Sequence, residues 1–216
     1  MFRESYKLYW GCLSHVGSNG RTYGLGCAIS PHHVLTAAHV ISTAITEDPP
    51  PMATMGTSIF RAEVVFNDAE LDLAVLRTGV AVYEHKSCHR LPARFPLIST
   101  AMPTPGTSVG FMGSVTRPET DADDREDIGL ITGALSFLVK ESQSGLRLAI
   151  SGGFAQEGFS GTAVFDQKGD LLGVMVQTMQ FRAGLRSRVP YMVNMPIMAA
   201  ISPIADKLQK IISSDT

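Results

Sequence analysis

Short apolar runs separated by turn-forming residues are the feature of this chain that most limits how it can fold. Runs rich in Val, Ile, Leu and aromatic residues alternate with clusters of Gly, Pro, Asn and Asp from Lys7 to Met195. This spacing is typical of β-barrels and sandwiches, because a βαβ fold needs helical segments of about ten residues or more between its strands. The pattern therefore predicts an all-β fold.

The apolar periodicity fades in the middle of the chain, which divides it into two halves. We predict a first barrel over residues 7–78, a connector over 79–96 and a second barrel over 97–198. A length of 216 residues fits one large all-β domain, so residues 1–216 are interpreted as a single domain built from two successive barrels.

The C-terminus changes from strand to helical periodicity. Ser202 is a candidate N-cap and Pro203 stands at the first helical position, followed by apolar residues that recur on one helical face. We predict an amphipathic helix over 203–213 that packs against the second barrel.

Charge, cysteine content and the lack of a long apolar run limit the partners, the thiol state and the location to be expected. The formal net charge is -2, which gives no electrostatic reason to expect nucleic acid or an acidic membrane surface as a partner. The three cysteines are an odd number without a C-x-x-C spacing, so free thiols are expected. No signal-peptide core or membrane-spanning apolar run is visible, and the prediction is a cytoplasmic protein.

A serine between glycines, in the stretch Gly158-Phe159-Ser160-Gly161-Thr162, is a candidate nucleophile. Glycines let the backbone turn sharply, so that amide N–H groups can face a carbonyl under attack. A serine hydroxyl also needs an imidazole to take its proton, and the imidazole needs an anion to fix its tautomer. His39 and Asp72 are the candidates for those two roles.

Three motifs carry a resemblance to a known family: VLTAAHV around His39, LDLAVLR around Asp72 and GFSGTAVFDQKGDLLGV around Ser160. The chain resembles the trypsin-like, chymotrypsin-fold serine proteases and looks closest to the bacterial HtrA-type and glutamyl-endopeptidase-type branch, without a PDZ domain. The resemblance implies two six-stranded antiparallel barrels with a C-terminal α-helix. It implies a His39–Asp72–Ser160 triad, with an oxyanion hole formed by the backbone N–H groups of Gly158 and Ser160.

The same resemblance implies where a substrate would bind. The run Val176-Gln177-Thr178 would pair with the substrate backbone as an added strand. The specificity pocket would include Phe154, Ala155 and Thr178, none of which is charged. We therefore expect an uncharged residue, rather than Lys or Arg, before the cleaved bond.

The chain also departs from the family pattern at three positions. Phe159 stands where digestive relatives have an aspartate that pairs with a newly cut N-terminus, so activity is not expected to need propeptide removal. Val40 replaces a disulfide cysteine of secreted relatives. Val176 replaces a serine that supports the triad aspartate in many relatives. Phe159 leaves open what holds the nucleophile turn in its active shape.

Other clusters are interpreted as structural. His85, Cys88 and His89 lack a fourth ligand at metal-site spacing, and the acidic loop from Glu119 to Asp127 lacks the glycine and closing glutamate of a calcium loop. No metal and no cofactor is expected. His32 and His33 lie in a turn and are expected to face solvent.

The sequence predicts a serine endopeptidase that acts on protein or peptide substrates through an acyl-enzyme. A catalytically weak or inactive peptide-binding protein on the same fold, and an esterase or amidase with the same triad, remain as alternatives. Regulation by a partner protein or by homo-oligomer formation is left open.

Overall fold

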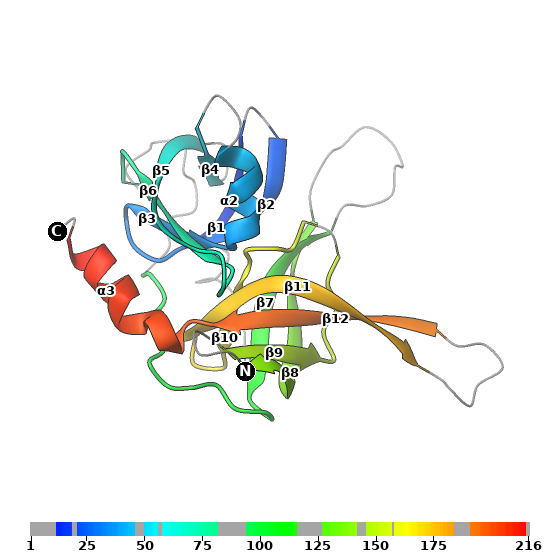
Figure 1. The fold of residues 1–216 in the computed structure, drawn as a ribbon. Coiled ribbons are helices and arrows are strands. Elements are labelled where there is room, and N and C mark those ends of the chain that lie inside the picture. Colours follow the sequence, from blue (N-terminus) through cyan, green and yellow to red (C-terminus); the bar gives the residue numbers. More distant parts are fainter. Residues whose placement is uncertain are drawn as a thin grey trace.

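The computed structural model describes residues 12–18, 21–45, 50–55, 58–81, 94–115, 127–141, 146–156, 158–183 and 191–214. Its strands form two closed antiparallel barrels of six strands each, and a helix follows near the C-terminus (Figure 1). The predicted all-β class with two barrels and a terminal helix is confirmed.

The first barrel has the strand order β1-β2-β3-β6-β5-β4. Its elements are β1 (Leu13–Ser18), β2 (Arg21–Ala28), β3 (His33–Thr36), α2 (Ala38–Ile45), β4 (Met52–Met55), β5 (Ser58–Asp68) and β6 (Leu73–Thr78). Along β5, buried Phe60 and Ala62 alternate with exposed Ile59 and Arg61, as expected for a strand with one face toward a core. The barrel closes where Val16 of β1 pairs with Ala53 of β4.

The second barrel repeats the same topology. Its strands are β7 (Ser108–Val115), β8 (Asp127–Glu141), β9 (Leu146–Ser151), β10 (Ala163–Asp166), β11 (Leu171–Ala183) and β12 (Tyr191–Ala200). Their order β7-β8-β9-β12-β11-β10 matches that of the first barrel, strand for strand. The two barrels are therefore two copies of one folding pattern.

The C-terminal helix packs against residues of both barrels. A short 3-10 turn, η1 (Ser202–Ile204), leads into α3 (Ala205–Ser213). Leu208 of α3 is buried in a core that contains side chains of both barrels, and the ammonium of Lys207 lies 4.5 Å from the centre of the Phe66 ring in β5. The helix was predicted against the second barrel alone, but it also contacts the first.

Two cysteines are buried near this core as free thiols. Cys12 and Cys27 are both unpaired, as expected, whereas Cys88 lies outside the described residues. A hydrogen bond with the Cys12 thiol, together with burial, raises the pKa of Cys27 well above its ordinary value. Cys27 is therefore a protonated, unreactive thiol near neutral pH.

Several sequence predictions need correction. No strand was predicted over Met52–Met55, where β4 forms. The Ser202 side chain does not cap the helix but contacts the Met102 sulfur at 3.4 Å. His33 is buried rather than solvent-facing, because its Nδ1 forms a 2.7 Å hydrogen bond with the Ser30 hydroxyl.

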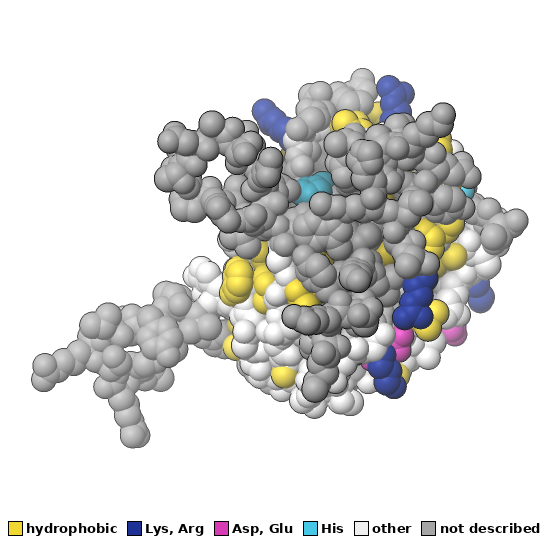
Figure 2. Space-filling model, turned by 180° about the vertical axis from the view of Figure 1, so that it is seen from behind, with side chains coloured by type: hydrophobic (Ala, Val, Ile, Leu, Met, Phe, Trp, Pro, Cys, Tyr) yellow, Lys and Arg dark blue, Asp and Glu magenta, His cyan; other side chains and the backbone are white. Residues whose placement is uncertain are grey.

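Other predictions fall outside the described residues. These are the strand start at 7–11, most of the connector, the His85, Cys88 and His89 cluster, and the acidic loop before Asp127. In the described part of the chain, no group of three or more His, Cys, Asp or Glu side chains could hold a metal ion, and no helix is long and apolar enough to cross a membrane. On the face shown in Figure 2, the described Lys and Arg side chains are scattered rather than gathered in one patch.

Candidate active site

His39 and Asp72, both of the first barrel, form a hydrogen-bonded pair. His39 lies in the first turn of α2, and Asp72 is the last residue of the turn before β6. The Asp72 carboxylate accepts two hydrogen bonds from His39: the backbone N–H bonds Oδ1 at 2.9 Å, and Nδ1 lies 2.8 Å from Oδ2. The Asp72 side chain is 16% exposed and that of His39 is 46% exposed, so the imidazole remains open to a substrate.

The turn that carries Asp72 is shaped by its own side chains. Oδ1 of Asp68 accepts hydrogen bonds from the backbone N–H groups of Glu70 and Leu71, at 3.1 and 2.9 Å. Asp72 itself has φ +60°, a left-handed conformation that Asp tolerates better than most residues. Its carbonyl accepts the Ala38 N–H at 3.1 Å, which joins the turn to the start of α2. The geometry of the pair is thus fixed by backbone as well as side-chain contacts.

Ser160 lies in a tight turn between β9 and β10. The flanking Gly158 and Gly161 both have φ +90°, where a side chain would be strained, so the glycines are required by the turn itself. The Gly161 N–H donates to the Met175 carbonyl at 2.8 Å, and the Thr162 N–H donates to the Phe159 carbonyl at 3.1 Å. The first bond holds the turn against β11, and the second closes the turn itself.

This turn also docks on the first barrel. The Leu25 N–H of β2 donates to the Ser160 carbonyl at 2.7 Å. A Cβ at Gly24 would lie 2.6 Å from the Ser160 carbonyl oxygen and 2.6 Å from the Val40 side chain, so both border one small space. Val40 follows His39 in α2, so the Ser160 backbone packs near the start of this helix although it is far away in the sequence.

The Ser160 hydroxyl has no hydrogen-bond partner within the described residues, His39 included. Hydrogen bonds between nucleophile and base are often long in enzymes without bound substrate and tighten when it binds. In this structure the Ser160 hydroxyl is thus not hydrogen-bonded to His39.

Two backbone N–H groups of this turn also lack a backbone hydrogen-bond acceptor among the described residues. Among the described residues, the N–H groups of Gly158 and Ser160 donate to no backbone carbonyl, whereas that of Phe159 between them bonds Gln156 O at 3.2 Å. Backbone N–H groups without a carbonyl partner remain available as donors to a negatively charged oxygen.

The predicted substrate strand lies next to this turn. β10 pairs with β11 only as far as Val174, and the β11–β12 register shifts between Met175 and Gln177, so that Val176 is a bulge residue. Beyond Met175, no described strand pairs with the β10-facing edge of β11. Gln177 and Thr178 therefore lie on an edge of β11 that none of the described strands covers.

The remaining predicted pocket residues differ in their exposure. The Phe154 ring is 49% exposed, whereas Ala155 and Val176 are buried. Thr178 is half-buried and Gln177 is exposed. Phe154 and Phe159 have ring centres 6.2 Å apart at an angle of 43°. The predicted pocket residues are thus apolar or neutral.

Sequence reasoning missed residues that let the barrels come together. The Thr36 hydroxyl borders Gly161 of the serine turn, where an added Cβ would lie 2.4 Å from its oxygen, and Gly24 leaves room for the Ser160 carbonyl. A glycine inside a strand often marks a close backbone approach, and this was the available signal for Gly24. Thr36 carries no such signal, because its role depends on a neighbouring strand.

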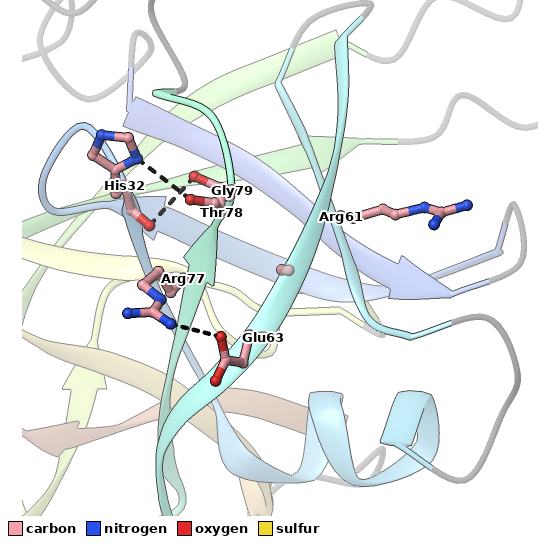
Figure 3. A pocket seen from close by; sticks show the side chains of 7 residues that line it. His32, Arg61, Glu63, Arg77, Thr78 and Gly79 are labelled. Carbon is pink, nitrogen blue, oxygen red and sulfur yellow. Dashed lines mark hydrogen bonds and ion pairs between the residues drawn. The ribbon is translucent and has the colours of Figure 1, made fainter. Parts of the chain in front are cut away.

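A separate cavity lies on the first barrel, away from these residues (Figure 3). It has a volume of about 570 Å³ and is lined by His32, Arg61, Ala62, Glu63, Arg77, Thr78 and Gly79. Arg77 pairs with Glu63 at 2.8 Å, and the Arg61 side chain points away from the other labelled residues. The cavity is at the far end of β6 from Asp72, so the site is identified by its side-chain chemistry rather than by cavity size.

Two barrels of identical topology, with a His–Asp pair and a glycine-flanked serine where they meet, define the class of trypsin-like serine endopeptidases. The chain belongs to the trypsin-like peptidase domain family, whose model matches residues 24–174. That range includes His39, Asp72 and Ser160, and the resemblance seen in the sequence is confirmed at this level. A comparison with curated proteins returned no match.

Solved structures share the fold at low sequence identity. An inactive form of a serine-to-alanine mutant of Rv3671c from M. tuberculosis has a TM-score of 0.62 and 18% identity, over 98% of this chain and 92% of that one. Kallikrein-related peptidase 10 has a TM-score of 0.68 and 14% identity, over 96% and 98%. A serine endoprotease from Yersinia pestis has a TM-score of 0.65 and 17% identity, over 99% of this chain and 67% of that one.

Proposed function

We propose that this peptidase cleaves peptide bonds through an acyl-enzyme, with Ser160 as nucleophile, His39 as general base and Asp72 as the residue that orients His39. The observation that carries the proposal is the 2.8 Å contact between His39 Nδ1 and Asp72 Oδ2. A proton held on Nδ1 leaves the Nε2 lone pair free to accept the hydroxyl proton.

The reaction follows from these positions. Ser160 Oγ attacks the scissile carbonyl carbon while His39 Nε2 takes the hydroxyl proton. The carbonyl oxygen becomes an oxyanion that accepts hydrogen bonds from the N–H groups of Gly158 and Ser160. His39 then gives the proton to the leaving amine, and water, activated in the same way, releases the acid from Ser160.

The substrate is an extended peptide that adds a strand to the open edge of β11 at Gln177 and Thr178. Main-chain hydrogen bonds at such an edge bind many sequences, so side-chain preference comes from the pocket before the scissile bond. Phe154, Ala155 and Thr178 offer no charge there, which favours an uncharged residue over Lys, Arg or Glu. A peptide-library profile dominated by charged residues at that position would contradict this part.

The competing hypothesis of a non-cleaving peptide-binding protein is favoured by one observation, the missing hydrogen bond between Ser160 and His39 in the described structure. A fluorophosphonate probe separates the two, because it reacts only with an activated serine. We expect labelling of the wild type, loss of labelling in Ser160→Ala, and full labelling of the control Ser99→Ala. An unlabelled wild type would contradict the proposal.

Cleavage assays then separate a peptidase from an esterase. A peptidase hydrolyses casein and peptide amides, whereas an esterase with the same triad turns over only activated esters. Labelling without casein or peptide cleavage would support the esterase alternative.

A further inference from the structure

The residue before the nucleophile is an aromatic side chain buried in the second barrel. Phe159 is only 2% exposed and belongs to a core cluster that also contains Val109, Phe111 and Ile131. Its backbone lies between the N–H groups of Gly158 and Ser160. The position of this ring therefore bears directly on the direction in which those two groups point.

The ring is seated over a glycine of β7. A Cβ at Gly113 would lie 2.3 Å from Cζ and 2.5 Å from Cε2 of Phe159, and 3.0 Å from Cδ1 of Ile131. No side chain fits in that space, because carbon atoms in contact are normally about 3.5 Å apart or more. The Phe159 ring thus packs directly against the backbone of Gly113.

A second contact ties the other side of the turn to the same strand. The buried Thr162 hydroxyl donates to the Met112 carbonyl at 2.6 Å. Residues on both sides of Ser160 are therefore attached to consecutive residues of β7, Phe159 to Gly113 and Thr162 to Met112. The nucleophile turn is clamped to the second barrel at two points.

We propose that Phe159 is a positioning residue whose ring, seated over Gly113, holds the N–H groups of Gly158 and Ser160 in the orientation that receives the oxyanion. The inference rests on the proposed acyl-enzyme function and names what fixes its oxyanion hole. The anchor is apolar, so it needs no ionic partner to hold the turn in its active shape. A shift of the ring rotates the backbone on either side of it and weakens both donors.

The test is to move the ring without touching any reacting group. Gly113→Ala places a methyl group where Cζ and Cε2 of Phe159 now lie. The matched control is Gly129→Ala, because Gly129 is the cross-strand partner of Gly113 in β8 and a Cβ there meets nothing within 4 Å. We measure the rate of fluorophosphonate labelling against probe concentration, which separates the maximal rate constant from the binding constant.

We expect Gly113→Ala to lower the maximal labelling rate by about 10²-fold, the effect of losing one oxyanion donor, with little change in the binding constant. Gly129→Ala should label like the wild type. Rates are normalised to the folded fraction from thermal unfolding monitored by circular dichroism. A Gly113→Ala protein that is less stable but labels at the wild-type rate per folded molecule would overturn the inference.

A second variant covers the case in which Gly113→Ala does not fold. Leu lacks the far ring atoms of Phe159, so Phe159→Leu should loosen the turn and slow labelling at least about tenfold. The double variant Phe159→Leu with Gly113→Ala has room for the added methyl, and we expect it to label faster than Gly113→Ala.

Unchanged labelling of Phe159→Leu would overturn the positioning role while leaving the proposed function intact. An unlabelled wild type would instead remove the proposed function, and the positioning role with it. The two failures are therefore distinguishable.

Discussion

Replacing Asp72 by Asn should change the tautomer of His39 while leaving the fold in place. Oδ1 of Asp72 accepts the backbone N–H of His39, and Oδ2 faces Nδ1. A backbone N–H can only donate, so the amide oxygen of the new Asn must take the Oδ1 position and its NH₂ group must face Nδ1. His39 can accept that hydrogen bond only with its own proton on Nε2. An Nε2–H cannot take the proton of Ser160.

The expected loss in kcat is about 10⁴-fold, which corresponds to ~5.4 kcal/mol of transition-state stabilisation at ~1.36 kcal/mol per factor of ten. The free energy of unfolding should change little. Asn tolerates the left-handed φ of Asp72 as well as Asp does, and the partly exposed pair with His39 contributes about 1 kcal/mol or less.

The assay is kcat on a fluorogenic peptide chosen from the library profile, with the melting temperature measured in parallel. Asp68→Asn is the matched control, because its side chain shapes the same turn through an Oδ1 that an Asn oxygen can replace. It should retain most of the wild-type kcat. If Asp72→Asn stays within tenfold of the wild type, the tautomer argument is wrong.

Three further predictions concern the surroundings of the site. Gly161→Ala should prevent stable folding, visible as a lost or strongly lowered melting transition, because φ is +90° and a Cβ would lie 1.9 Å from a β2 carbonyl oxygen. Thr162→Val should lower the free energy of unfolding by about 1–3 kcal/mol in urea titration, since the buried Met112 carbonyl loses its donor. Cys27 should resist iodoacetamide at neutral pH in the native protein and react after unfolding, because its contact with Cys12 and its burial raise its pKa. Native-state alkylation as fast as that of a solvent-exposed cysteine would contradict this.

Most strands were predictable because alternating apolar residues and turn residues act locally. β4 was the exception, since Met52–Met55 lacks the β-branched run that marks a strand. It forms because closing the barrel requires a strand between β1 and β5. Within β4, Ala53 pairs with Val16 of β1 on one side and with Phe60 of β5 on the other. Barrel closure is a property of the whole sheet and cannot be seen in four residues.

The helix ends illustrate the same limit. Ser202 followed by Pro203 has the local pattern of a helix start, but the chain first forms η1 and the serine contacts Met102. His33 was predicted as a solvent-facing turn residue. It is buried, and a hydrogen bond with the Ser30 hydroxyl satisfies its imidazole there. In both cases the conformation of a polar side chain depends on a contact that forms only in the folded protein, with Met102 for Ser202 and with Ser30 for His33.

The sequence by itself determined the all-β class, the two successive barrels, and the serine turn with its glycines, because short-range patterns encode strands and left-handed turn positions directly. Only the tertiary structure decided that His39 and Asp72 meet at 2.8 Å, that β2 docks on the Ser160 turn, and that the Phe159 ring rests on Gly113. These contacts join residues from separate strands and turns. Their geometry depends on how the two barrels close and pack, which no local pattern contains.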